Sequence, residues 1–259
     1  MLSLTQVALG LGSGSLVGFS LGLVGGGGSI LAVPLLVYLV GVPNPHVAIG
    51  TSAIAVAVNA AANLVNYGRA GHVKWRCASI FAAAGVAGAF LGSTLGKIVE
   101  GQKLLALFAI VMIVVGALML KGRFGAGEPS VRLNRENLPK LLASGLIAGT
   151  LSGFFGIGGG FLIVPALIVA TGMPILYAVG SSLVAVTAFG LTTAANYALS
   201  GLVDWYLAAL FISGGILGGL LGIRSANSLA RRKGALNAVF AMLIFAVAIY
   251  MLVRNLSLR

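Results

Sequence analysis

The chain has 259 residues, of which 59% are hydrophobic and only 8% charged, with a formal net charge of +12. Soluble globular proteins carry about a quarter charged residues, so this composition excludes a protein that lies mostly in water. The basic excess does not indicate nucleic-acid binding, because the charges lie in short gaps between long apolar runs, where the positive-inside rule accounts for them. The lone cysteine, Cys77, excludes an intramolecular disulfide.

Long apolar segments follow one another along the chain in two sets. The first set comprises 7–24, 28–41, 46–68, 75–97 and 103–120; the second comprises 139–156, 159–172, 175–200, 205–224 and 234–253. A transmembrane helix needs about 20 mostly apolar residues, so the chain is predicted to be an all-α polytopic membrane protein. The second segment of each set is short, because 28–41 would reach only about 21 Å as a helix, against a bilayer core of about 30 Å.

The two sets repeat one sequence. GLVGGGGSILAVPLL at 22–36 matches GFFGIGGGFLIVPAL at 153–167, AIGTSA at 48–53 matches AVGSSL at 178–183, and NYGRAGHVKW at 66–75 matches NYALSGLVDW at 196–205. The repeat predicts a first membrane unit at 1–120 and a second at 141–259. The charged stretch at 121–140 is predicted to be a cytoplasmic linker between them.

Loop charges indicate how the two units are oriented. The loops at 69–76, 121–140 and 224–233 are rich in Lys and Arg, and are predicted to be cytoplasmic, whereas 97–103 and 200–205 are predicted to face outside. A loop that is basic in one unit is not basic in the other, which predicts inverted topology. The two segments around the glycines must then cross an even number of times, as two short spans or one re-entrant hairpin. Both termini are predicted to be periplasmic.

Glycine runs interrupt an apolar segment at the same place in each unit. They free backbone N–H and C=O groups, which a membrane tolerates only inside protein or beside water. Short interrupted segments at matching positions are the best sequence indication of a transporter's binding site. A short helix predicted to begin at Ser29 and at Phe161 would offer a positive dipole end to an anion. The alternative is that the glycines only permit close helix packing. The candidate backbone site comprises Gly26, Gly27, Gly28, Ser29, Gly158, Gly159 and Gly160.

Polar side chains inside the predicted spans extend this candidate site. Hydroxyls early in the third segment of each unit, which donate to an anion without carrying charge, are those of Thr51, Ser52, Ser181 and Ser182. Candidates for gating or entrance are Asn63, Asn66, Arg69 and Asn196. The alternative for each uncharged residue of these two sets is a structural hydrogen bond to a neighbouring helix. We favour this interpretation for Asn63, and also for Asn59, which lies one helical turn earlier.

The predicted spans contain no Asp or Glu. Cation transporters and proton relays commonly place carboxylates there, so an anionic substrate is favoured over a cation. Motifs for a catalytic site, a phosphate-binding loop or a metal cluster are also missing from the sequence. We therefore expect a protein that is not an enzyme and needs neither a cofactor nor a metal.

The repeated glycine motif, followed in each unit by AIGTSA or AVGSSL, resembles the sulfite exporter TauE/SafE family of membrane permeases. The resemblance implies a secondary transporter in the cell inner membrane that moves sulfite or organosulfonates by alternating access around a midplane site. Alternatives are a permease for a metal cation or a neutral solute, or an integral membrane enzyme. The expected partners are a small anion and the bilayer, with the oligomeric state left open. In one departure from exact repetition, Gly26 matches Ile157 and Ser29 matches Gly160.

Overall fold

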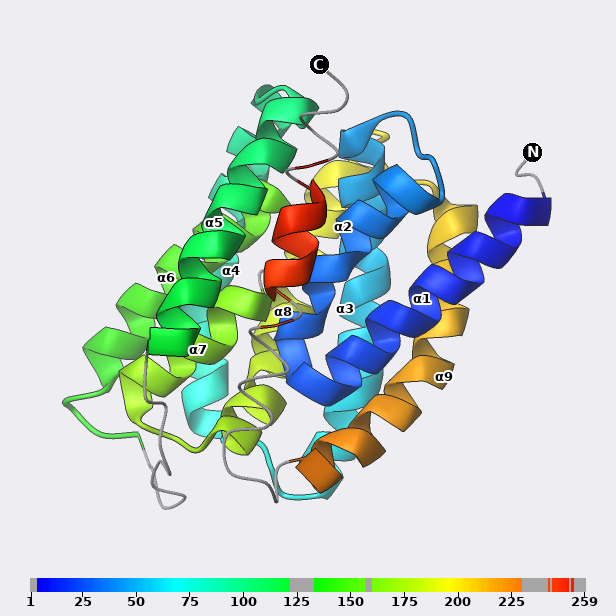
Figure 1. Ribbon diagram of the computed structural model, residues 1–259. Coiled ribbons are helices and arrows are strands. Elements are labelled where there is room, and N and C mark those ends of the chain that lie inside the picture. Colours follow the sequence, from blue (N-terminus) through cyan, green and yellow to red (C-terminus); the bar gives the residue numbers. More distant parts are fainter. Residues whose placement is uncertain are drawn as a thin grey trace.

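A computed structural model describes residues 4–121, 133–156, 160–229, 242, 244–251 and 253. Throughout these residues the regular elements are helices, and no strand occurs among them (Figure 1). The elements are α1 (Leu4–Val24), the 3-10 helix η1 (Gly25–Leu31), α2 (Ala32–Pro34), the π-helix η2 (Leu35–Leu39), α3 (Pro45–Arg69), α4 (Trp75–Ile98), α5 (Gly101–Lys121), α6 (Leu138–Phe155), α7 (Gly160–Thr171), α8 (Ile175–Ala198) and α9 (Trp205–Leu229). Residues 244–251 are also helical.

Six of these helices are long and apolar enough to cross a membrane, namely α1, α3, α4, α6, α8 and α9. The predicted all-α polytopic membrane protein is confirmed at this level. Large apolar side chains such as Phe90, Leu91 and Leu217 are exposed on α4 and α9. Exposed apolar surface of this kind is expected where helices face lipid rather than water.

Three pairs of left-handed glycines mark corresponding turns in the two units. The backbone φ is +64° at Gly25 and +67° at Gly156, +80° at Gly41 and +74° at Gly172, and +72° at Gly71 and +68° at Gly201. Each pair occupies matching positions of the sequence repeat. Because only glycine adopts this conformation at low cost, these turns show that the repeat extends to the backbone.

The helices pair across the two units. The first helix of each unit packs along the fourth helix of the other, so that α1 lies beside α9 (Figure 1) and α6 beside α4. These pairs run parallel and very close: a Cβ on Gly18 would overlap the backbone of Gly215, and a Cβ on Gly149 would overlap that of Gly85. The third helices, α3 and α8, pack against each other. This pairing is reciprocal between the two units.

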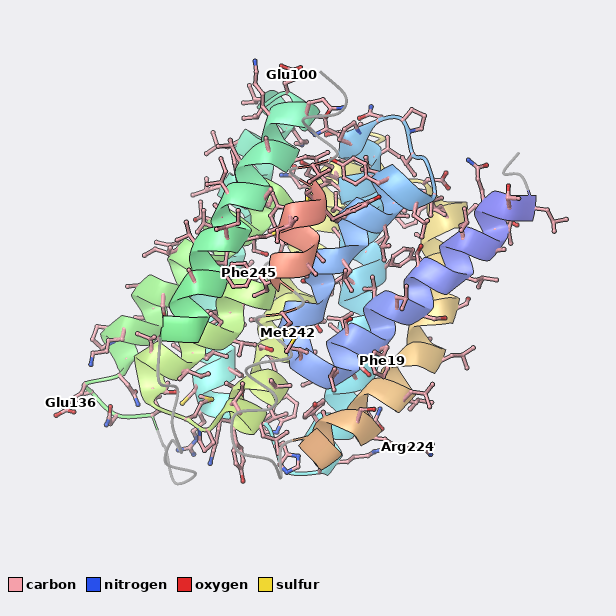
Figure 2. All side chains as sticks on the ribbon, in the orientation of Figure 1. Phe19, Glu100, Glu136, Arg224, Met242 and Phe245 are labelled. Carbon is pink, nitrogen blue, oxygen red and sulfur yellow. The ribbon has the colours of Figure 1, made fainter. Side chains whose placement is uncertain are left out.

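The charged loops lie at the two ends of the bundle. Figure 2 shows Glu100 at one end and both Glu136 and Arg224 at the other. The turn between α3 and α4 lies at the Arg224 end, together with the start of α6 and the end of α9 (Figure 1). Described parts of the three loops predicted to be cytoplasmic thus share one end. Which end faces the cytoplasm stays a prediction.

The α1 helix forms a hairpin with the interrupted segment that follows it, which comprises η1, α2 and η2. In Figure 1, α1 begins at the end where Glu100 lies, and after η1, α2 and η2 the chain returns to that end before α3 begins. The chain therefore enters and leaves this hairpin at the same end of the bundle. The hairpin turns at Gly25, immediately after α1.

Candidate functional site

The first glycine break differs from its prediction. No regular helix begins at Ser29; instead the 3-10 helix η1 starts directly after α1, and α2 contains only three residues. The chain folds back tightly, since a Cβ on Gly28 would overlap the backbone of Ser20. Pro34 lacks an N–H and crowds the preceding turn, and the wider turns of η2 follow it. The first unit therefore offers irregular backbone rather than a helix N-terminus.

The second break follows the prediction more closely. The α6 helix ends at Phe155, and the N–H of Gly156 donates to the carbonyls of Ser152 at 2.9 Å and Gly153 at 3.1 Å. The α7 helix begins at Gly160, one residue before the predicted start, and runs for 12 residues. Gly158 and Gly159 lie outside the described residues.

The two breaks touch each other. A Cβ on Gly160 would overlap the carbonyl of Gly26, and a Cβ on Gly26 would lie 2.7 Å from the Cα of Gly160. The N–H of Gly26 donates to the Ser182 hydroxyl at 3.0 Å, and the Ser29 hydroxyl donates to the Gly26 carbonyl at 2.8 Å. Four predicted site residues, two from each unit, are thus brought together.

The other predicted hydroxyls have structural partners. Thr51 accepts a hydrogen bond from the backbone N–H of Asp204, and Ser181 accepts one from that of Lys74, each at 2.9 Å. Ser52 donates to the carbonyl of Ile49 at 2.9 Å. Thr51 and Ser181 occupy matching positions, and each holds the interhelical turn of the other unit. For these two side chains the alternative, a structural hydrogen bond, accounts for the contact.

Asn196 belongs to a network between α8 and α4. Its Nδ2 donates to Ser93 at 2.7 Å and to Thr94 at 3.0 Å, while its Oδ1 accepts from Lys97 at 2.8 Å. Lys97 also donates to the Asn196 carbonyl at 3.2 Å and to Ser200 at 2.9 Å. A lysine in this position caps the free carbonyls at the end of α8.

The remaining entrance candidates are not brought together with Asn196. Asn66, at the matching position, donates to the carbonyl of Ala62 in its own helix at 3.3 Å. Arg69 is exposed at the end of α3, and Asn63 is buried against Gly219 of α9. The two units therefore use matching asparagines in different ways.

Several buried polar groups inside the bundle have no hydrogen-bond partner. Asn59 is 1% exposed and both its Nδ2 and Oδ1 lack one, so the expected interhelical bond is wrong for this residue. The hydroxyls of Ser152, Thr193 and Tyr197 also lack partners. The sequence places Thr193 on one polar stripe with Ser181 and Asn196, whereas nothing local distinguishes Ser152 and Tyr197 from hydroxyls that bond to their own helix.

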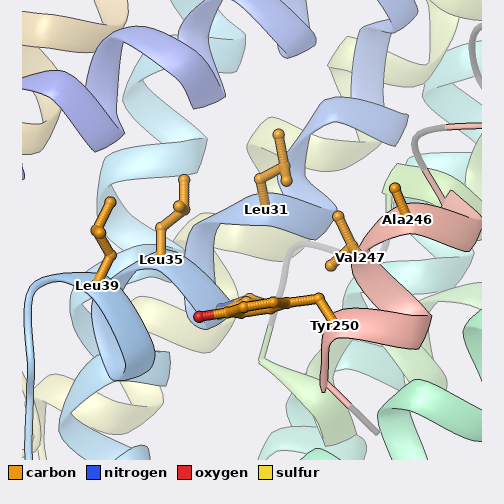
Figure 3. Close-up of a pocket in the computed structure, with 7 residues that line it drawn as sticks. Leu31, Leu35, Leu39, Ala246, Val247 and Tyr250 are labelled. Atoms are coloured by element: carbon orange, nitrogen blue, oxygen red, sulfur yellow. The ribbon is translucent and has the colours of Figure 1, made fainter. Parts of the chain in front are cut away.

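A pocket of about 250 Å³ lies between the interrupted segment and the C-terminal helix (Figure 3). Its lining comprises Leu31, Pro34, Leu35, Leu39, Ala246, Val247 and Tyr250. These residues carry no charge and a single hydroxyl, so the pocket does not suit an anion. None of the predicted site residues lines it.

The comparisons with known proteins agree with a membrane transporter. Residues 10–251 match the family model described as "Sulfite exporter TauE/SafE". The chain is 54% identical over 257 residues, 98% of each chain, to a "Probable membrane transporter protein" of Xylella fastidiosa strain Temecula1. It is 30% identical to the "Probable membrane transporter protein YunE" of Bacillus subtilis, over 83% of this chain and 85% of that protein. No solved structure matches the chain significantly.

Proposed function

The chain belongs to the sulfite exporter TauE/SafE family of membrane transporters, and from this premise we propose that it moves small sulfur-containing oxyanions, such as sulfite or organosulfonates, across the cell inner membrane. The observation that carries the proposal is the contact between the breaks at Gly26 and Gly160. Interrupted backbone from both repeats meets there, as in the binding sites of many transporters.

Backbone N–H groups and hydroxyls are the binding groups in this proposal. The α7 helix begins at Gly160, next to Gly26, and its N-terminus carries about half an elementary positive charge. Ser29 and Ser182 supply hydroxyls at the same place. Since α1 and α3 to α9 contain neither Asp nor Glu, no carboxylate within them repels an anion. A site without a full positive charge binds weakly and permits release.

Access to the site requires the breaks to separate, because the backbones of Gly26 and Gly160 touch in this structure. The proposed mechanism is alternating access around a midplane site between the repeats. The glycine-packed pairs α1–α9 and α4–α6 are too closely fitted to part at low cost. Each pair contains one helix from the first unit and one from the second. Each pair would therefore move as a rigid body relative to α3 and α8.

Flux into liposomes tests this function. Purified protein is reconstituted, and uptake of sulfite and of a panel of organosulfonates is measured beside uptake of a divalent cation and of a neutral solute. Anion flux above that of protein-free liposomes, without cation flux, is expected. Cation or neutral-solute flux with no flux across the anion panel would reject the proposal.

A further inference from the structure

Three buried hydroxyls of the second unit have no hydrogen-bond partner. Ser152 on α6 is 1% exposed, and Thr193 and Tyr197 on α8 are fully buried. Their neighbours behave differently: Thr192 and Thr187 donate to the carbonyl four residues earlier in α8, at 2.8 and 2.7 Å. Buried polar groups are normally paired, so these three unpaired hydroxyls are donors available to a ligand that supplies oxygen acceptors.

In the first unit, the positions that correspond to Thr193 and Tyr197 meet next to Gly22, which follows Leu21, the match of Ser152. The Tyr67 hydroxyl, which matches Tyr197, donates to the carbonyl of Gly22 at 2.8 Å. Gly219 of α9 lies against both helices: a Cβ on Gly22 would overlap its carbonyl, and a Cβ on Gly219 would be 2.5 Å from Oδ1 of Asn63. Asn63 matches Thr193. Positions 22, 63 and 67 therefore converge around Gly219.

The repeat places the same convergence in the second unit. Gly153 matches Gly22, and a Cβ on it would overlap the carbonyl of Ala89, which matches Gly219. Thr193 and Tyr197 are one helical turn apart on α8 and so share a face, and Ser152 immediately precedes Gly153. By this correspondence, the three unpaired hydroxyls are expected beside the turn that ends α6. Unlike Tyr67, Tyr197 makes no bond to a backbone carbonyl.

We propose that Ser152, Thr193 and Tyr197 form a hydroxyl site that binds the transported oxyanion on the second-unit side of the glycine breaks. This inference rests on the proposed function and adds residues to its site. Three neutral O–H donors are available, and an oxyanion presents acceptors on several oxygens. In the first unit the equivalent tyrosine, Tyr67, already donates to the Gly22 carbonyl, so the proposed hydroxyl site exists in the second unit alone.

Hydroxyl-deleting variants of similar shape test the site, namely Ser152→Ala, Thr193→Val and Tyr197→Phe. Sulfite binding to the purified full-length protein is measured by calorimetry, and the midpoint of thermal unfolding is measured without sulfite. Each variant is expected to weaken sulfite binding by about tenfold or more, as for loss of a hydrogen bond to a charged group. The unfolding midpoint should stay unchanged or rise. The matched control Thr192→Val should bind sulfite as the wild type does.

The possible outcomes separate this inference from the proposed function. If the wild type binds sulfite and all three variants bind it equally well, the hydroxyl site is wrong and the proposed function stands. If the wild type binds neither sulfite nor a sulfonate, the proposed function fails, and the unfolding midpoints decide the inference. The inference is overturned if Tyr197→Phe lowers the unfolding midpoint as far as Tyr67→Phe does, because the Tyr197 hydroxyl then has a structural partner. An unchanged midpoint for Tyr197→Phe supports a hydroxyl that is available to a ligand.

Discussion

The hydroxyl of Tyr67 donates a 2.8 Å hydrogen bond to the backbone carbonyl of Gly22. Tyr67 lies near the end of α3, and Gly22 lies three residues before the left-handed turn at Gly25. The bond therefore fastens α3 to α1 directly beside the first glycine break. It satisfies a carbonyl that would otherwise be buried without a partner.

Tyr67→Phe is expected to lower the free energy of unfolding by about 1–2 kcal/mol, because the variant loses a buried hydrogen bond and leaves the Gly22 carbonyl unpaired. Unfolding in detergent, followed by circular dichroism, measures the change. Tyr197→Phe is the matched control, since that hydroxyl has no bond to lose. Wild-type stability in Tyr67→Phe would show that the bond contributes nothing.

Gly160→Ala is expected to disrupt the meeting of the two breaks. The added methyl group would overlap the carbonyl of Gly26, and overpacking of this kind costs about 1–3 kcal/mol. We expect a lower unfolding midpoint and loss of sulfite flux in liposomes.

Gly12→Ala is the matched control, because nothing lies within 4 Å of a Cβ at that position of α1. Alanine favours a helix over glycine by about 1 kcal/mol, so this variant should keep its flux and be slightly more stable. Equal effects of Gly160→Ala and Gly12→Ala on flux would argue against a functional contact at the breaks.

Gly215→Ala and Asn59→Ala should be coupled. A Cβ on Gly215 would overlap the carboxamide of Asn59, so Gly215→Ala alone is expected to destabilise by about 1–3 kcal/mol. In an Asn59→Ala background the same change should cost much less, because the obstructing group is gone. A double-mutant cycle on unfolding free energies measures the coupling. Strictly additive effects would contradict the packing described for α3 and α9.

The sequence predicts most of the helical framework. The segment expected at 75–97 is α4, Trp75–Ile98, and the one expected at 46–68 is α3, Pro45–Arg69. These limits are readable because charges, prolines and glycines mark the ends of apolar runs. Partner choice is not readable from one sequence, since many glycine stripes could pack together. That α1 pairs with α9 emerges only in the folded chain.

The candidate site is predicted in part. Four predicted residues do converge, namely Gly26, Ser29, Gly160 and Ser182. They could be predicted because glycine breaks at matching repeat positions are a strong local signal in the sequence. The left-handed turn is at Gly25 rather than within the candidate residues. Thr51 and Ser181 bond to turns of the opposite unit, and no local pattern shows that such a turn lies beside them.

The orientation of the bundle is tested with Glu100→Cys and Glu136→Cys in a Cys77→Ala background. Both glutamates are exposed and lie at opposite ends (Figure 2). The positive-inside rule predicts that Glu100→Cys reacts with a membrane-impermeant thiol reagent in intact cells, whereas Glu136→Cys reacts only after permeabilisation. Reaction of both residues from the same side would contradict the predicted topology.

The most direct measurement is an experimental structure of the full chain determined with saturating sulfite or an organosulfonate that it transports. We expect density for one oxyanion between the two breaks, within hydrogen-bonding distance of backbone N–H groups near Gly26 and Gly160. Density for the anion only among the basic loop residues, with the breaks still in contact, would contradict it.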